Sequence, residues 1–186
     1  MAVIESYSAT DSDELFPRIA RLVQAGGVLA VPTETYYGLG VNPFDGMAVT
    51  RLLSIKGRPD GKPILILIGD QAQLQELVTD VSPAAQVLME DFWPGPLTLV
   101  FSSSASLQKS VTAGTGTIGV RHTSHAALAK LLRYTGPLTG TSANRSGEPP
   151  VQTAAEVERT IGTLVDVILD GGPTQGGLPS TVLSVC

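Results

Sequence analysis

Residues 28–40 indicate the fold class, and they read VLAVPTETYYGLG. The first four, Val28 to Val31, are apolar and suit a buried strand, and Gly26-Gly27 before them ends a predicted helix. A polar cluster of Pro, Thr, Glu, Tyr and Gly follows the strand. Open α/β sheets bind their ligands at strand ends, so the stretch predicts a sheet with a ligand site at its edge. An ordinary hydrogen-bonded loop is equally consistent with this cluster, because Thr, Gly and Pro are common in turns.

The flanking sequence alternates between helical and strand patterns. Asp11 and Glu14 form a capping-box pattern ahead of apolar residues at helical spacing, and Ser82-Pro83 is typical of a helix start. The alternation predicts an α/β or α+β fold, and a chain of 186 residues suits one domain, 1–186. Further helices are predicted at 46–55, 71–77 and 124–133, and another is capped by Thr153 and Glu156. Strands are predicted at 64–68, 97–101, 118–121, 138–141, 167–169 and 181–185.

The composition is that of a folded, acidic protein. Apolar residues make up 42% of the chain and charged residues 16%. No apolar run approaches the roughly 20 residues of a spanning helix, and the first residues lack a signal-peptide pattern, so we expect a cytoplasmic protein without membrane contact. The net charge of −5 disfavours strong non-specific binding to nucleic acid. The single cysteine, Cys186, excludes an intrachain disulfide and a cysteine metal cage.

Two more polar clusters flank predicted strands. Residues 56–63, KGRPDGKP, carry three cations on a segment stiffened by two prolines, which suits the oxygens of a polyphosphate but also a solvated surface loop. Residues 141–147, TSANRSG, follow the strand at 138. Their hydroxyls and amide are able to bind a nucleotide's phosphates or ribose, or to close the loop.

Other motifs are less informative. Gly114, Gly116 and Gly119 match a dinucleotide-binding pattern, but Gly119 leads into a strand rather than a helix, which favours a plain loop. The chain contains no P-loop, so any ATP must bind in another way. His122 and His125 have no third metal ligand nearby in sequence, which favours surface or packing roles.

Taken together, the polar motifs resemble those of the YrdC/TsaC family, the L-threonylcarbamoyl-adenylate synthases that begin threonylcarbamoyladenosine (t6A) formation in tRNA. The match covers nearly the whole chain, and the chain resembles the short, single-domain form of the family. Seven ordered motifs carry it: Pro32-Thr33-Glu34-Thr35 with Tyr37-Gly38-Leu39-Gly40, Lys56-x-Arg58-Pro59, Trp93-Pro94-Gly95-Pro96-Leu97-Thr98, Val120-Arg121, Ser142-Ala143-Asn144-x-Ser146-Gly147, Asp170-Gly171-Gly172 and Ser180-Thr181.

The resemblance implies a strongly twisted open mixed sheet with flanking helices and a concave basic cavity. It implies that ATP, L-threonine and bicarbonate are converted to threonylcarbamoyl-AMP and pyrophosphate, with Mg2+ held by the nucleotide. Downstream threonylcarbamoyl transferase machinery is the implied partner, and tRNA contact is not expected to be strong. The implied site residues are Lys56 and Arg58 for catalysis; Lys56, Arg58, Lys62, Thr117, Ser142, Asn144 and Thr153 for ATP; and Thr35, Arg121 and Ser180 for L-threonine.

The chain departs from the family pattern at two positions. Many longer members have Asn where this chain has Lys62 and His where it has Leu67. Lys62 adds positive charge near the polyphosphate, and Leu67 removes one polar contact to threonine. Two alternatives remain: an RNA-binding module of the same fold, which the acidic charge and an aromatic content of 5% disfavour, and a paralogue acting on another carbamoyl compound.

Overall fold

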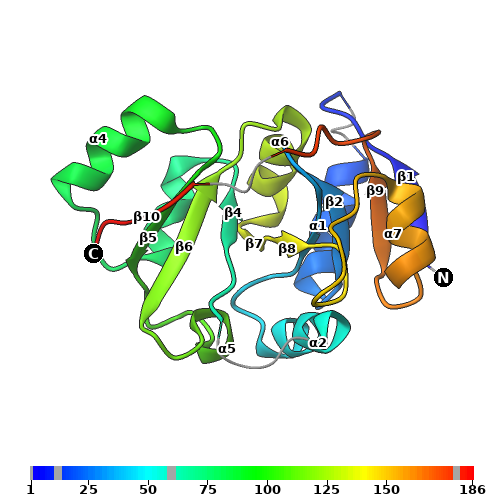
Figure 1. Ribbon diagram of the computed structural model, residues 1–186, viewed down its shortest axis with the longest axis horizontal. Helices are drawn as coiled ribbons and strands as arrows, with labels where there is room; N and C mark the ends of the chain where they lie inside the picture. Colours follow the sequence, from blue (N-terminus) through cyan, green and yellow to red (C-terminus); the bar gives the residue numbers. More distant parts are fainter. Residues whose placement is uncertain (1, 11–13, 58–61, 178–180) are drawn as a thin grey trace.

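Two five-stranded mixed sheets lie side by side and organise the chain (Figure 1). This computed structural model describes residues 2–10, 14–57, 62–177 and 181–186. The strand order is β1-β9-β2-β3-β8 in the first sheet and β10-β5-β6-β4-β7 in the second. Helices flank both sheets, so the predicted α/β class is confirmed, with the strands divided between two sheets (Figure 1).

The first sheet brings the N-terminal strand next to a strand from late in the chain. Strands β1, β9 and β2 run parallel to one another, while β3 is antiparallel to both β2 and β8. The strands are β1 (Val3–Ser6), β2 (Leu29–Pro32), β3 (Tyr37–Gly40), β8 (Thr141–Ser142) and β9 (Val167–Asp170).

The second sheet is built mainly from the middle of the chain. Strand β5 pairs in parallel with β10 and antiparallel with β6, and β4 pairs in parallel with β6 and antiparallel with β7. The strands are β4 (Ile66–Ile68), β5 (Leu97–Ser102), β6 (Thr117–His122), β7 (Leu138–Thr139) and β10 (Thr181–Ser184).

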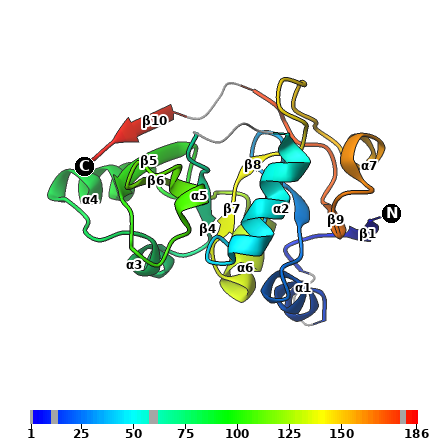
Figure 2. The same cartoon turned by 90° about the horizontal axis from the view of Figure 1, so that it is seen from below.

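Helices bury the first sheet on both of its faces. Alternate residues of a strand point to opposite faces, so Ala30 enters one buried cluster, whereas Leu29 and Val31 enter another that includes α1 and α6. The helices α1 and α6 pack against each other (Figure 2). The helices are α1 (Leu15–Gln24), α2 (Gly46–Lys56), α3 (Leu74–Leu77), α4 (Pro83–Phe92), α5 (Lys109–Thr112), α6 (Ala126–Thr135) and α7 (Ala154–Ile161), with a 3-10 turn, η1 (Gln71–Gln73), before α3.

Several predicted helix starts are confirmed. Ser82 caps α4 by accepting a hydrogen bond from the Ala85 amide, and the Thr153 and Glu156 capping box of α7 is complete. The Asp11 part of the first capping pattern lies outside the described residues, although α1 itself is present. In the part of the chain that the structure covers, no helix has the length and apolar character needed to cross a bilayer.

Other elements differ from the predictions. The cluster after β2 does not remain a loop, because Tyr37–Gly40 forms β3 and pairs with β2. The sequence pattern also did not predict β1 or α5. The loop reading of Gly114 and Gly116 agrees with their positive φ angles, and Gly119 lies in β6.

Gly140 connects the two sheets. The strand predicted at 138–141 is divided there, because β7 belongs to the second sheet and β8 to the first. The Gly140 amide donates to the Leu65 carbonyl at 2.7 Å, which continues the register of the β4–β7 pairing by one residue before the chain crosses to β8. A Cβ at Gly140 would lie only 2.7 Å from Leu67 Cγ. Glycine is therefore required by the close approach of the Leu67 side chain.

Candidate functional site

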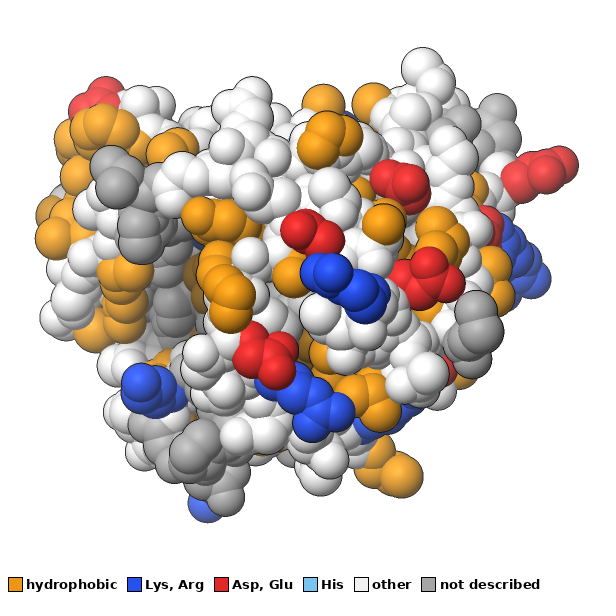
Figure 3. Space-filling view, turned by 45° about the vertical axis from the view of Figure 1, so that its right-hand side comes forward, with side chains coloured by type: hydrophobic (Ala, Val, Ile, Leu, Met, Phe, Trp, Pro, Cys, Tyr) orange, Lys and Arg blue, Asp and Glu red, His pale blue; other side chains and the backbone are white. Residues whose placement is uncertain are grey.

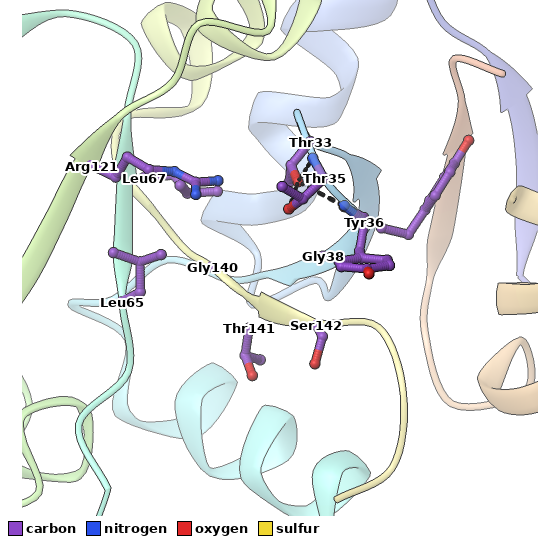
Figure 4. A pocket seen from close by; sticks show the side chains of 11 residues that line it. Thr33, Thr35, Tyr36, Gly38, Leu65, Leu67, Arg121, Gly140, Thr141 and Ser142 are labelled. Atoms are coloured by element: carbon purple, nitrogen blue, oxygen red, sulfur yellow. Dashed lines mark hydrogen bonds between the residues drawn. The ribbon is translucent and has the colours of Figure 1, made fainter. Parts of the chain in front are cut away.

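A cavity of about 140 Å³ opens where the two sheets meet (Figure 4). One side is formed by the turn between β2 and β3 and by β8, and the other by β4 and β6. Leucine, threonine and glycine residues make up most of the wall, and among the described lining residues Arg121 supplies the positive charge. The lining residues are Thr33, Thr35, Tyr36, Tyr37, Gly38, Leu65, Leu67, Arg121, Gly140, Thr141 and Ser142.

The β2–β3 turn is held by its own hydrogen bonds. The Thr33 hydroxyl donates to the Tyr36 carbonyl at 2.7 Å and accepts from the Thr35 amide at 3.3 Å. The Thr33 and Thr35 hydroxyl oxygens are 3.5 Å apart. This local bonding fixes Thr35 at the cavity wall, on the side toward which Arg121 extends (Figure 4).

Tyr37 anchors the start of β3. Its hydroxyl donates to the Gly172 carbonyl at 2.8 Å and lies 3.4 Å from an Asp170 carboxylate oxygen. Burial, together with the negative charge of Asp170, raises the pKa of Tyr37 to about 12. The phenol therefore stays protonated at neutral pH and serves as a hydrogen-bond donor.

Arg121 is a buried cation with a carboxylate partner. It extends from β6 and is only 4% exposed, and its Nη2 donates to Glu34 Oε2 at 3.0 Å. Glu34 belongs to the β2–β3 turn, so the ion pair joins a loop of one sheet to a strand of the other. A buried guanidinium without such a partner would be strongly destabilising.

The Glu34 carboxylate is also bound at the start of α6. Its Oε1 accepts from the Thr123 hydroxyl and from the Ser124 amide, both at 2.6 Å, and from the His125 amide at 3.3 Å. Burial alone would raise the pKa of Glu34, but the charge of Arg121 and these hydrogen bonds outweigh burial and lower it. Glu34 is therefore ionised at neutral pH.

Lys56 organises the next part of the site. Its ammonium donates to the Ser142 carbonyl and the Asn144 carbonyl, each at 2.6 Å, and approaches Ser142 Oγ at 3.3 Å and Asn144 Oδ1 at 3.2 Å. Lys56 ends α2, where Gly57 adopts a left-handed C-cap conformation. The side chain is buried, so its charge is solvated by these four oxygens rather than by bulk water.

The predicted site residues fall into three groups. Thr35, Arg121 and Ser142 line the same cavity, and Lys56 and Asn144 join Ser142 through the hydrogen bonds above. Among the described residues, Lys62, Thr117 and Thr153 do not line this cavity: Lys62 is exposed, Thr117 starts β6, and Thr153 caps α7. Arg58 and Ser180 lie outside the described residues.

Sequence reasoning assigned no role to Glu34. It stands between two threonines in the polar turn, where any of several side chains could have been the functional one. A usable signal was Arg121, a cation within an apolar predicted strand, because a buried cation requires a carboxylate partner from elsewhere in the chain.

The two histidines make packing contacts. His122 meets the Trp93 ring edge-on, with centroids 6.2 Å apart, and burial lowers its pKa. His125 stacks on Tyr7 and accepts from the Leu128 amide at the start of α6. Burial also lowers the pKa of His125, so both rings are neutral at neutral pH.

Comparison with known proteins identifies similar chains. Residues 21–186 match the Sua5_yciO_yrdC family model, whose description reads Telomere recombination. The chain is 38% identical to a threonylcarbamoyl-AMP synthase of Pyrococcus abyssi over 89% of its own length and 49% of the relative, and 39% identical to one of Coxiella burnetii over 86% and 87%. A crystal structure of P. abyssi Sua5 complexed with L-threonine superposes with a TM-score of 0.88 at 35% identity, covering 100% of this chain and 54% of that one. The chain thus spans about half the length of the P. abyssi protein.

Proposed function

Because the chain belongs to the Sua5/YciO/YrdC family, we propose that it is a threonylcarbamoyl-AMP synthase acting at the first step of t6A formation. The observation that carries the proposal is the cavity in which Thr35, Arg121 and Ser142 meet. Relatives that bear this enzyme name align over most of the chain, and the related P. abyssi structure contains L-threonine. The proposed substrates are ATP, L-threonine and bicarbonate.

We propose that the cavity holds the amino acid. Arg121 supplies a positive guanidinium for the threonine carboxylate, a pairing that is strong and directional. The Thr35 hydroxyl is placed to form a hydrogen bond with a polar atom of the substrate. Leu67 lies in the apolar part of the cavity wall, which the methyl group of threonine would contact. Contact with one methyl group gives only about 1–3 kcal/mol of discrimination, so selectivity for threonine over serine is expected to be moderate.

We propose that the nucleotide lies on the Lys56 side of the cavity, where Ser142 and Asn144 are tied together. The threonine amine takes up CO2 from bicarbonate to form a carbamate. A carbamate oxygen then attacks the α-phosphorus of ATP, and pyrophosphate leaves with the electron pair of the broken P–O bond. Positioning and charge neutralisation accelerate such a displacement, so Lys56 and Arg58 would offset the charge that develops on pyrophosphate.

We propose that Mg2+ enters with ATP. Among the described residues, no group of three His, Cys, Asp or Glu side chains gathers in one place. Mg2+ commonly binds through phosphate oxygens and water with few protein ligands, so we expect ATP itself to supply most of the ligands of the ion. The ion would supply charge neutralisation on the phosphates, while Lys56 and the 142–144 segment position them.

The test is a turnover assay with purified protein, ATP, bicarbonate and L-threonine. We expect pyrophosphate release and an AMP-linked product that both require threonine and bicarbonate. Omitting threonine, or replacing it with D-threonine, provides the matched control. Pyrophosphate release that does not depend on threonine would refute the proposal.

The face of the molecule drawn in Figure 3 does not favour the RNA-binding alternative. On the face drawn in Figure 3, Lys and Arg side chains lie among Asp, Glu and apolar side chains. RNA-binding modules instead gather cations and exposed aromatic rings on one face. With a net charge of −5, the synthase is the better supported function.

A further inference from the structure

Glu34 joins the amino-acid side of the cavity to the rest of the fold. Its carboxylate receives Arg121 from β6 on one oxygen, and Thr123, Ser124 and His125 at the start of α6 on the other. Its side chain is only 15% exposed, and that of Arg121 is 4% exposed. Both oxygens are therefore fixed by partners from the second half of the chain.

The negative charge of Glu34 is stabilised by several of these partners at once. Backbone amides at a helix start carry a partial positive charge, and the amides of the N-cap residue His125 and of Ser124 before it donate to Oε1 just ahead of α6. The carboxylate is thus stabilised partly by α6 and partly by Arg121. The guanidinium of Arg121 also lines the cavity, where it is the positive group among the described lining residues.

We propose that Glu34 is a positioning residue that orients the Arg121 guanidinium toward the carboxylate of the bound amino acid. The inference rests on the proposed function. Arg121 both bonds the Glu34 carboxylate and lines the cavity, and its planar fork accepts a bidentate partner only in a narrow range of orientations. Fixing Nη2 on Glu34 removes the rotation that would misalign this fork.

A purely structural role predicts a different outcome. Glu34 also ties the two sheets together, so its loss could loosen the whole cavity. General loosening would weaken ATP and threonine together. Loss of orientation at Arg121 would weaken threonine alone, because the nucleotide side is held by Lys56 through separate hydrogen bonds.

The experiment compares the wild type with Glu34→Gln, which keeps an oxygen acceptor but removes the charge. Calorimetric titration measures the Kd of L-threonine and, separately, of ATP. We expect threonine to bind about 10-fold to 100-fold more weakly in the variant, the effect of losing one charge-assisted hydrogen bond, with ATP unchanged within about twofold. In turnover, KM for threonine should rise while kcat is retained.

Glu90→Gln is the matched control, because Glu90 is an exposed glutamate of α4 and should leave both Kd values unchanged. Thr123→Val removes one donor to Glu34 and provides a second test if Glu34→Gln does not fold, with an expected loss of about 3-fold to 10-fold for threonine alone. Unchanged threonine binding, or equal weakening of ATP and threonine, would overturn the inference. A wild type that binds no threonine would overturn the proposed substrate and, with it, this inference.

Discussion

Replacing Gly140 with alanine should force the Leu67 side chain out of its place. The added Cβ would lie 2.7 Å from Leu67 Cγ and 2.9 Å from its Cδ1. Carbon atoms pack best at about 3.5–4.0 Å, so the leucine must retreat by on the order of 1 Å. Leu67 is buried, and overpacking of this kind costs about 1–3 kcal/mol of unfolding free energy. Because Leu67 also lines the cavity, threonine binding should weaken as well.

The energetic cost of the contact between residue 140 and Leu67 is measured by a double-mutant cycle. Urea unfolding is followed for the wild type, Gly140→Ala, Leu67→Ala and the double variant, with the slope m checked for constancy. Leu67→Ala alone should cost about 2–5 kcal/mol, because it leaves a cavity. In that background the clashing atoms are gone and Gly140 has no positive φ, so Gly140→Ala should be neutral or stabilising by up to about 1 kcal/mol. Equal costs of Gly140→Ala in both backgrounds would refute the packing argument.

Three further predictions follow from the site and the helix starts. Lys56→Met should lower the unfolding free energy by about 2–5 kcal/mol and abolish turnover, because the Ser142 and Asn144 carbonyls lose a buried charged donor. Lys109→Met, at an exposed position, is the control, and equal stability of the two variants in urea would contradict the predicted role of Lys56. The pKa of Glu34 is lowered from its ordinary value of 4.5, so the ionised carboxylate stabilises the fold above pH 4.5 and this contribution is lost as the pH falls through the folded-state pKa. The difference in unfolding free energy between wild type and Glu34→Gln should therefore shrink on acidification, and a difference that grows would contradict the lowered pKa. Thr153→Ala should cost about 0.5–2 kcal/mol in chemical unfolding because it removes the α7 cap, whereas Thr153→Ser should retain most of the stability.

Local patterns were sufficient for most helices and several strands. Ser82-Pro83 and the pair Thr153 and Glu156 act through neighbours three or four residues away, so the sequence alone shows where these helices begin. The division at Gly140 is different in kind. It depends on the Leu67 side chain and the Leu65 carbonyl, more than seventy residues earlier in the chain, and no local pattern encodes that contact.

The sequence predicted which residue types line the candidate site better than it predicted the hydrogen bonds and ion pairs between them. The polar clusters of Thr35 and Ser142 were expected to meet at strand ends, and both line the cavity. The role of Glu34 was not predicted, because it follows from the distance between a turn and the start of α6, which are about ninety residues apart. A carboxylate in a turn is usually solvated, and only tertiary structure shows that this one is bound at both oxygens.

The pairing of β1 with β9 has a consequence for biosynthesis. Val3 lies opposite Val167, and β9 stands between β1 and β2, so neither early strand has its parallel neighbour until residues 167–170 have been made. Such long sequence separations slow folding, and unpaired apolar strand edges promote association with other chains. We expect a nascent chain that ends before residue 167 to depend on chaperones, because the first sheet closes only once β9 is available to pair with β1 and β2.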